Sequence, residues 1–176
     1  MDTSVVGWQV QALKAAHTTG ISIAGLDRCM RNAEDYFKKA QGPNGSFTYR
    51  AGNHKASLGG VGTLCMILLG QPDSDVVKKG LEFIATRHPK GSKKSSVGDP
   101  YEWYYNMFAS IMAGGKVWKQ VNNHAMDAYI DSQDQKGFWN TGHTHFPGQG
   151  QDAQVYYTTL CTLALEVYYR YLPSAK

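Results

Sequence analysis

Two stretches of sequence decide the fold. Residues 41–47 read Gln-Gly-Pro-Asn-Gly-Ser-Phe, and residues 133–139 read Gln-Asp-Gln-Lys-Gly-Phe-Trp. In both, a Gln is followed by a Gly after three intervening residues, and an aromatic closes the motif after one more. The two glutamines are 92 positions apart (133 − 41), and the midpoint, 46 positions after the first, is Arg87. This spacing predicts a repeat of about 46 residues, which is long enough for two helices and their connections.

The midpoint carries a third, degenerate copy of the pattern. An aromatic residue stands four positions before each of the three points: Phe37, Phe83 and Tyr129. Gly91 falls at the position of the two motif glycines, whereas the Gln and the terminal aromatic are missing from this copy. Three copies in phase indicate that the repeat runs through the chain.

Helical periodicity fills the segments between these points. In residues 155–171, apolar and aromatic side chains recur at positions i, i+3, i+4, i+7, i+8 and i+11, which form one face of a helix. We expect helices near 3–17, 25–40, 56–69, 74–86, 100–113, 116–132 and 153–171. No stretch shows sustained two-residue alternation, so strands should be scarce, with short extended pieces at 48–50 and 138–140.

Residues that start or stop helices stand at the borders of these segments. Left-handed glycine stops are expected at Gly20, Gly70 and Gly114-Gly115. Candidate N-caps are Asp2, Asp73 or Ser74, Asp99 and Asp152, and Pro100 suits a first helical turn. The pattern predicts an all-α fold of stacked αα-hairpins, about seven helices in a single domain that spans residues 1–176. In each motif turn, the Gln side chain should cap the preceding helix and the aromatic should pack against the next hairpin.

The motif resembles the repeat signature of a known superfamily. Gln-x-x-x-Gly-x-Trp is similar to the signature of the terpenoid cyclase and protein prenyltransferase α/α-toroids, and residues 79–83 resemble the front half of its squalene-cyclase form. Residues 2–9, 101–105 and 155–160 resemble the starts of the toroid's inner helices. The whole chain is similar to the bacterial squalene-cyclase-like (prenyltransferase/squalene oxidase) repeat proteins. The resemblance implies a partial α/α toroid, a fragment or half-ring of a longer one.

The catalytic residues of that superfamily are not found. Squalene cyclases use an Asp-x-Asp-Asp motif, and the nearest stretch, residues 73–76 (Asp-Ser-Asp-Val), lacks the last Asp. Protein prenyltransferases bind zinc through Asp-x-Cys and through a His in a Tyr-His-Thr context. Residues 27–29 (Asp-Arg-Cys) lie within an expected helix, and Tyr157 stands where that His would be. The resemblance therefore predicts the fold and leans away from catalysis.

Composition excludes several classes of protein. The chain has 176 residues, of which 42% are hydrophobic and 18% charged, so it can bury a core without a disulfide or metal. No apolar run approaches the roughly 20 residues that span a bilayer. The net charge is +4, and its local excess in residues 87–94 is typical of a solvated loop, so we expect no nucleic-acid partner. Cys65 and Cys161 lie in apolar runs and are expected to be reduced core residues.

Aromatic residues gather at the starts of the expected inner helices. We single out Trp8, Trp103, Tyr104, Tyr156 and Tyr157 as candidate ligand-binding residues. The resemblance implies that these helix ends converge on one mouth. The rings then form either tight packing between helices or an aromatic cup for an apolar or cationic ligand.

His143 and His145 form a metal-like pair with His-x-His spacing. Zinc and copper accept imidazole at this spacing, but a site needs three or four ligands, for which Asp152 and His54 are the available helpers. A polar loop is the favoured interpretation, so no metal and no cofactor are expected.

These observations favour a non-catalytic repeat module that binds a partner chain or a small apolar ligand on its concave aromatic face. The alternative is a fragment of an isoprenoid-handling enzyme, of the terpenoid cyclase or prenyltransferase type, without its catalytic acid or zinc ligands. Because an arc of hairpins leaves its end faces apolar, a second copy is expected to complete it as a homodimer through the open toroid ends.

Overall fold

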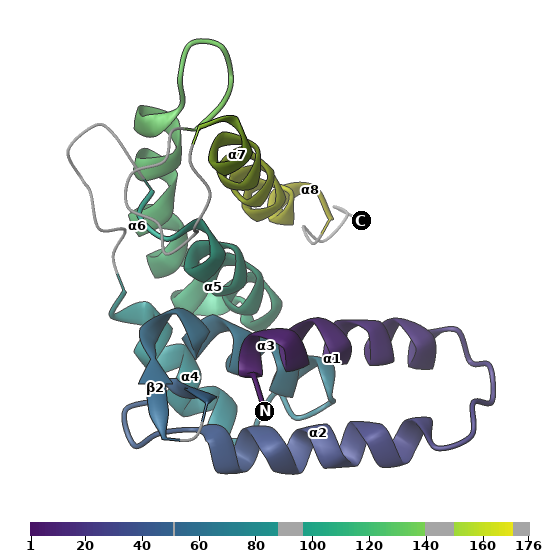
Figure 1. The fold of residues 1–176 in the computed structure, drawn as a ribbon. Coiled ribbons are helices and arrows are strands. Elements are labelled where there is room, and N and C mark those ends of the chain that lie inside the picture. Colours follow the sequence, from purple (N-terminus) through teal and green to yellow (C-terminus); the bar gives the residue numbers. More distant parts are fainter. Residues whose placement is uncertain (51, 88–96, 140–149, 171–176) are drawn as a thin grey trace, which may run out of the picture. The chain divides into compact units, whose positions relative to one another are not determined.

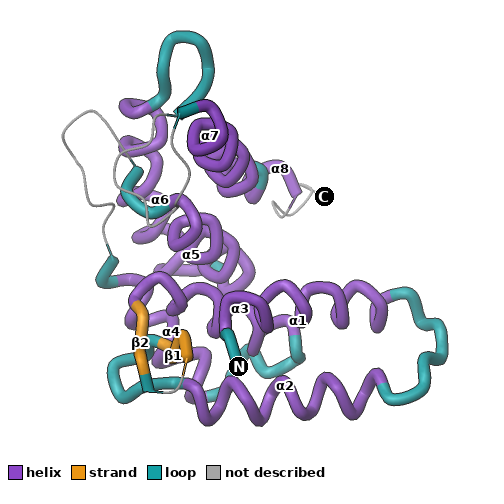
Figure 2. Tube along the Cα trace, viewed as in Figure 1, coloured by secondary structure: helices purple, strands orange, loops and turns teal. Residues whose placement is uncertain are grey.

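The computed structural model of the chain describes residues 1–50, 52–87, 97–139 and 150–170. The chain divides into two compact units, Met1–Ile84 and Ala85–Lys176, which are described separately. Helices make up most of both units, so the predicted all-α fold class is confirmed (Figure 2). His143, His145 and most of the basic run 87–94 lie outside the described residues.

The first unit contains a long helical hairpin followed by a small sheet and a shorter pair of helices (Figure 1). Its elements in chain order are α1 (Thr3–Thr18), α2 (Leu26–Ala40), β1 (Phe47–Arg50), β2 (Asn53–Lys55), the 3₁₀ turn η1 (Ala56–Leu58), α3 (Gly59–Leu68) and α4 (Asp75–Ala85). Strands β1 and β2 pair antiparallel. Helix α1 packs against α2, α3 and β1, and α3 is buried along most of its length.

The second unit repeats the helical part of this order. Its elements are α5 (Pro100–Ala113), α6 (Gly115–Ser132), α7 (Gln151–Leu165) and α8 (Val167–Arg170). Helix α5 packs against both α6 and α7, and its residues 102–110 are all buried, so α5 is the central helix of this unit.

Helix boundaries follow the predicted caps with one exception. The Asp2 carboxylate accepts the Ser4 N–H at 3.0 Å, and the Asp99 carboxylate accepts the Tyr101 N–H at 3.0 Å. Of the two alternatives before α4, Ser74 is the one whose hydroxyl accepts a helix N–H. The prediction for Asp152 is wrong, because α7 already begins at Gln151 and Gly150 occupies the N-cap position.

The two motif turns, 92 residues apart, share the same backbone features. An isolated antiparallel bridge joins Gln41 to Phe47, and another joins Gln133 to Trp139. Inside each bridge, the residue after the Gln donates its N–H to the carbonyl of the residue just before the turn aromatic, Gly42 to Ser46 and Asp134 to Phe138, at 2.8 Å in both cases. The motif glycines have φ of +88° at Gly45 and +89° at the equivalent position, a left-handed conformation that glycine adopts at little cost.

The aromatic residues of the turns pack as predicted, but the glutamines do not cap their own helices. Phe47 is fully buried with its ring against Gly62 of α3, in the next hairpin. The indole N–H of Trp139 donates to a carbonyl of α6 at 3.0 Å, and its backbone N–H donates to the Thr158 hydroxyl of α7 at 3.2 Å. The Gln41 amide reaches forward to the Val76 carbonyl at 2.8 Å, in the next hairpin rather than at the end of α2.

Some helix boundaries of the first unit recur in the second unit at the spacing of the motif. Helices α2 and α6 end at Ala40 and Ser132, and α3 and α7 begin at Gly59 and Gln151. Both separations equal the 92 residues between the motif glutamines (132 − 40 and 151 − 59). The 92-residue spacing of the motif therefore recurs at these helix boundaries, whereas the 46-residue period stays a prediction, because most of its middle copy lies outside the described residues.

Candidate binding surface

Most of the aromatic residues predicted to bind a ligand lie in the interior of the second unit. Trp103 is 2% exposed, Tyr104 is buried, and Tyr157 is fully buried with its hydroxyl donating to the Gly98 carbonyl at 2.9 Å. The Tyr104 ring packs edge-on against Tyr105, with ring centroids 4.8 Å apart. These three side chains therefore expose little or no surface.

The remaining two candidates have accessible surface, and they belong to different units. Tyr156 of α7 is half-buried, and burial together with the negative charge of Asp99 raises its pKa. Trp8 of α1 is 46% exposed. Trp8 is thus the predicted residue that offers the largest aromatic surface to a binding partner.

Trp8 belongs to a continuous apolar stripe on α1. The exposed apolar residues of the helix are Val5, Trp8, Ala12 and Ala15, and Met1, also exposed, lies just before the N-cap Asp2. Their spacing alternates between four and three residues, which is the heptad seam that packs against another helix in coiled coils. We call these five residues the α1 seam. Trp8 was predicted as a binding residue but the seam was not, although its heptad spacing is visible in the sequence.

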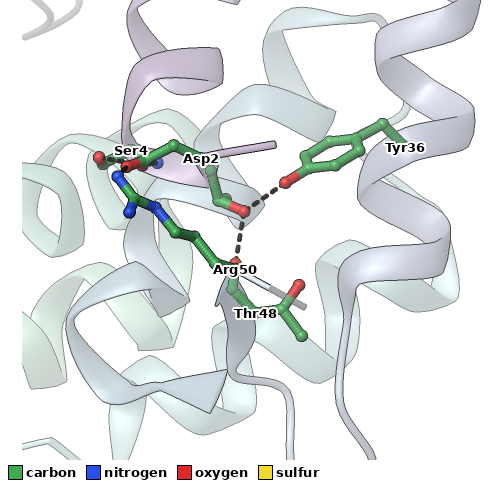
Figure 3. A network of polar contacts seen from close by, with 6 residues as sticks. Asp2, Ser4, Tyr36, Thr48 and Arg50 are labelled. Carbon is green, nitrogen blue, oxygen red and sulfur yellow. Dashed lines mark hydrogen bonds and ion pairs between the residues drawn. The ribbon is translucent and has the colours of Figure 1, made fainter. Parts of the chain in front are cut away.

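The opposite face of α1 is anchored in its own unit. Thr3, Val6, Gly7 and Val10 are buried on that face. The Thr3 hydroxyl contacts the Tyr36 hydroxyl of α2 at 2.6 Å and donates to the carbonyl of Thr48 in β1, so it ties the start of α1 to two other elements (Figure 3). This anchoring holds the seam in a fixed position.

Charged contacts stabilise the same end of the helix. The Asp2 carboxylate accepts hydrogen bonds from both the backbone and the hydroxyl of Ser4, and its other oxygen pairs with Arg50 at 3.1 Å (Figure 3). Partial burial alone would raise the pKa of Asp2, but hydrogen bonds from Ser4, Tyr49 and Arg50 outweigh that effect and lower the pKa to about 2. The group is ionised at neutral pH and acts as a structural cap.

A line of polar residues runs along α5 in the second unit. Glu102, Asn106 and Ser110 follow one another at intervals of four residues, and all three are buried. Arg87, at the degenerate copy of the Gln position, binds both oxygens of Glu102, with the shorter contact at 2.7 Å. The Ser110 hydroxyl donates to the Met107 carbonyl. Two of these three groups therefore have structural partners within the unit.

The described residues hold no cluster of side chains that could bind a metal ion. No group of three or more His, Cys, Asp or Glu side chains there could hold a metal ion. The Asp75 side chain is fully open to solvent at the start of α4, and burial raises the pKa of the Cys161 thiol to about 12, which keeps it protonated. Cys65 and Cys161 are buried, as predicted, and all three cysteines are free.

Comparisons with known proteins and the lengths of the helices assign no family and no membrane-spanning segment to the described residues. No family model, curated protein or solved structure matches the chain. None of the described helices is both long and apolar enough to cross a bilayer.

Proposed function

We propose that this protein is a non-catalytic αα-hairpin repeat module that binds a partner chain, and that the α1 seam is its binding surface. The observation that carries the proposal is the exposure of Val5 and Trp8, 52% and 46%, on a helix whose other face is firmly anchored. Exposed apolar surface of this kind is typical of protein interaction sites. Tryptophan is also among the residues that contribute most to binding energy at interfaces.

A partner chain is favoured over a small apolar ligand by the burial of the aromatic candidates. A ligand cup needs rings that line an accessible cavity. Trp103 and Tyr157 already pack in the interior, whereas the α1 seam is long and narrow. Its heptad spacing suits an α-helix better than a compact molecule.

Non-catalytic character is supported by the roles that the reactive side chains already have. Asp2 caps α1, and Glu102 is held by Arg87. The proposed toroid relationship is consistent with this, since the same fold supports enzymes and binding proteins alike.

Site-specific photo-crosslinking tests the proposal. A photoreactive phenylalanine analogue replaces Trp8, and in a matched control it replaces Ile130, an exposed apolar residue of α6. In the cells that make the protein, we expect a polypeptide adduct from position 8 and none from position 130. The absence of any polypeptide adduct at position 8, or the same adducts from both positions, would contradict the proposed function.

A further inference from the structure

We infer that the partner bound by the α1 seam is the α1 seam of a second copy of this chain, with the two helices antiparallel about a two-fold axis. This inference rests on the proposed function and names its partner. The first argument for it is the order of side-chain sizes along the seam. Met1, Val5 and Trp8 are large and occupy the N-terminal half, whereas Ala12 and Ala15 are small and occupy the C-terminal half.

Antiparallel pairing matches large residues to small ones. If the two-fold axis passes near residue 10, Trp8 of each copy lies against Ala12 of the other, and Val5 lies against Ala15. Knobs then enter holes of suitable size along the whole seam. Parallel pairing would instead place Trp8 against Trp8 and alanine against alanine, which crowds one end and leaves voids at the other.

Charge does not oppose the association of two copies. The helix from Thr3 to Thr18 carries one formal charge at neutral pH, on Lys14, which is outside the seam. An isologous contact brings every charged group close to its own duplicate, so a face almost without charges is well suited to it.

The residues of α5 that correspond to the α1 seam indicate that this face of the helix can be buried by packing. The N-caps Asp2 and Asp99 place α1 and α5 in register with an offset of 97 residues (99 − 2). In that register Val5, Trp8 and Ala12 correspond to Glu102, Tyr105 and Ala109, and these three residues of α5 are buried. The same helix face is therefore covered in one copy of the hairpin and exposed in the other.

Sedimentation equilibrium of the full chain over a concentration series tests the association. An α1–α1 contact is small, so we expect a dimer with a dissociation constant of about 1–100 μM. Ala12→Glu should raise this constant at least tenfold, because it places a carboxylate against Trp8 of the other copy. Gln9→Glu adds the same charge to an exposed position outside the seam and should leave the constant within about threefold. Circular dichroism should be unchanged in both variants, since both residues are exposed.

Disulfide trapping tests the antiparallel geometry, with the exposed Cys29 replaced by Ser throughout. A mixture of the Val5→Cys and Ala15→Cys proteins should form a crosslinked heterodimer. Neither protein should crosslink with itself, because a rise of about 1.5 Å per residue puts the two copies of position 5 about 15 Å apart. Crosslinking of Val5→Cys with itself would overturn the antiparallel pairing.

The outcomes separate this inference from the proposed function. A chain that stays monomeric up to several hundred micromolar overturns the self-association. If the position-8 photo-crosslink then joins a different polypeptide, the proposed function stands and only the identity of the partner is wrong. An adduct between two copies of this chain, together with loss of dimer in Ala12→Glu, supports both.

Discussion

The two motif glycines provide a matched pair of substitutions within one chain. Gly45 and Gly137 have the same backbone conformation, with φ of +88° and +89°. Their surroundings differ. A Cβ added at Gly45 would lie 2.4 Å from the carbonyl oxygen of Lys79 and 2.8 Å from the Cβ of Phe83. A Cβ added at Gly137 would meet no atom of the described chain within 4 Å.

Alanine at either position should therefore destabilise the protein, but by different amounts. A non-glycine residue in the left-handed region costs about 1–2 kcal/mol, and this penalty applies to both variants. Gly45→Ala adds overlap with the backbone of α4, for which overpacking costs of about 1–3 kcal/mol are typical. We expect Gly137→Ala to lower the free energy of unfolding by about 1 kcal/mol and Gly45→Ala by about 3 kcal/mol.

Urea denaturation followed by circular dichroism measures the difference, with the slope m as a check that the extent of unfolding is unchanged. Hydrogen exchange of amides in each unit then assigns the loss to the unit that carries the substitution. Equal losses in the two variants, or a larger loss in Gly137→Ala, would refute the conclusion that the first turn packs tightly against the next hairpin.

Four further substitutions test other contacts. Gly80→Ala should destabilise α4 although alanine favours helices, because its Cβ would lie 2.1 Å from the Thr63 hydroxyl oxygen. In a double-mutant cycle, adding Thr63→Ala should recover most of the lost stability. Trp139→Phe removes an indole N–H that donates to a backbone carbonyl and should lower the free energy of unfolding by about 1–3 kcal/mol in urea titrations. Asn106→Leu should raise the thermal midpoint, because this amide is 1% exposed and has no hydrogen-bond partner in the described chain. Asp2→Asn should weaken the fall in stability at low pH. Because the pKa of Asp2 is lowered to about 2, its carboxylate adds to the free energy of unfolding above about pH 4, on the order of 1 kcal/mol after solvent screening, and this contribution is lost as the pH falls toward 2. Unfolding at several pH values measures it.

The backbone of this protein could be predicted from local signals. Left-handed glycine stops were predicted at Gly20, Gly70 and Gly114-Gly115, and all of these glycines have positive φ. Acidic residues directly before the helical segments predicted N-caps, and Asp2 and Asp99 are N-caps in the structure. These features depend on a few neighbouring residues, so the sequence contains nearly all the information that determines them.

The contacts and burial of side chains depend on residues far away in the sequence, and they were predicted less well. The Gln41 amide donates to the Val76 carbonyl in the first turn of α4, 35 residues further on, a contact that sequence spacing does not reveal. Asp152 lost the N-cap position because α7 extends two residues beyond its predicted start. The burial of Trp103 and the exposure of Trp8 could not be distinguished either, because both lie near the starts of helices with similar patterns.

Corresponding positions of α1 and α5 differ in polarity and exposure, and this difference supports a function that depends on a binding surface. In the α5 copy of the hairpin, the seam face bears Glu102 and Tyr105, which are buried, and the carboxylate is held by Arg87. In the α1 copy, the corresponding positions bear Val5 and Trp8, which are apolar and exposed. An exposed position normally favours polar side chains. Large apolar residues at these positions are expected where a further helix covers them, and the self-complementary order of sizes along α1 favours a second copy as its source.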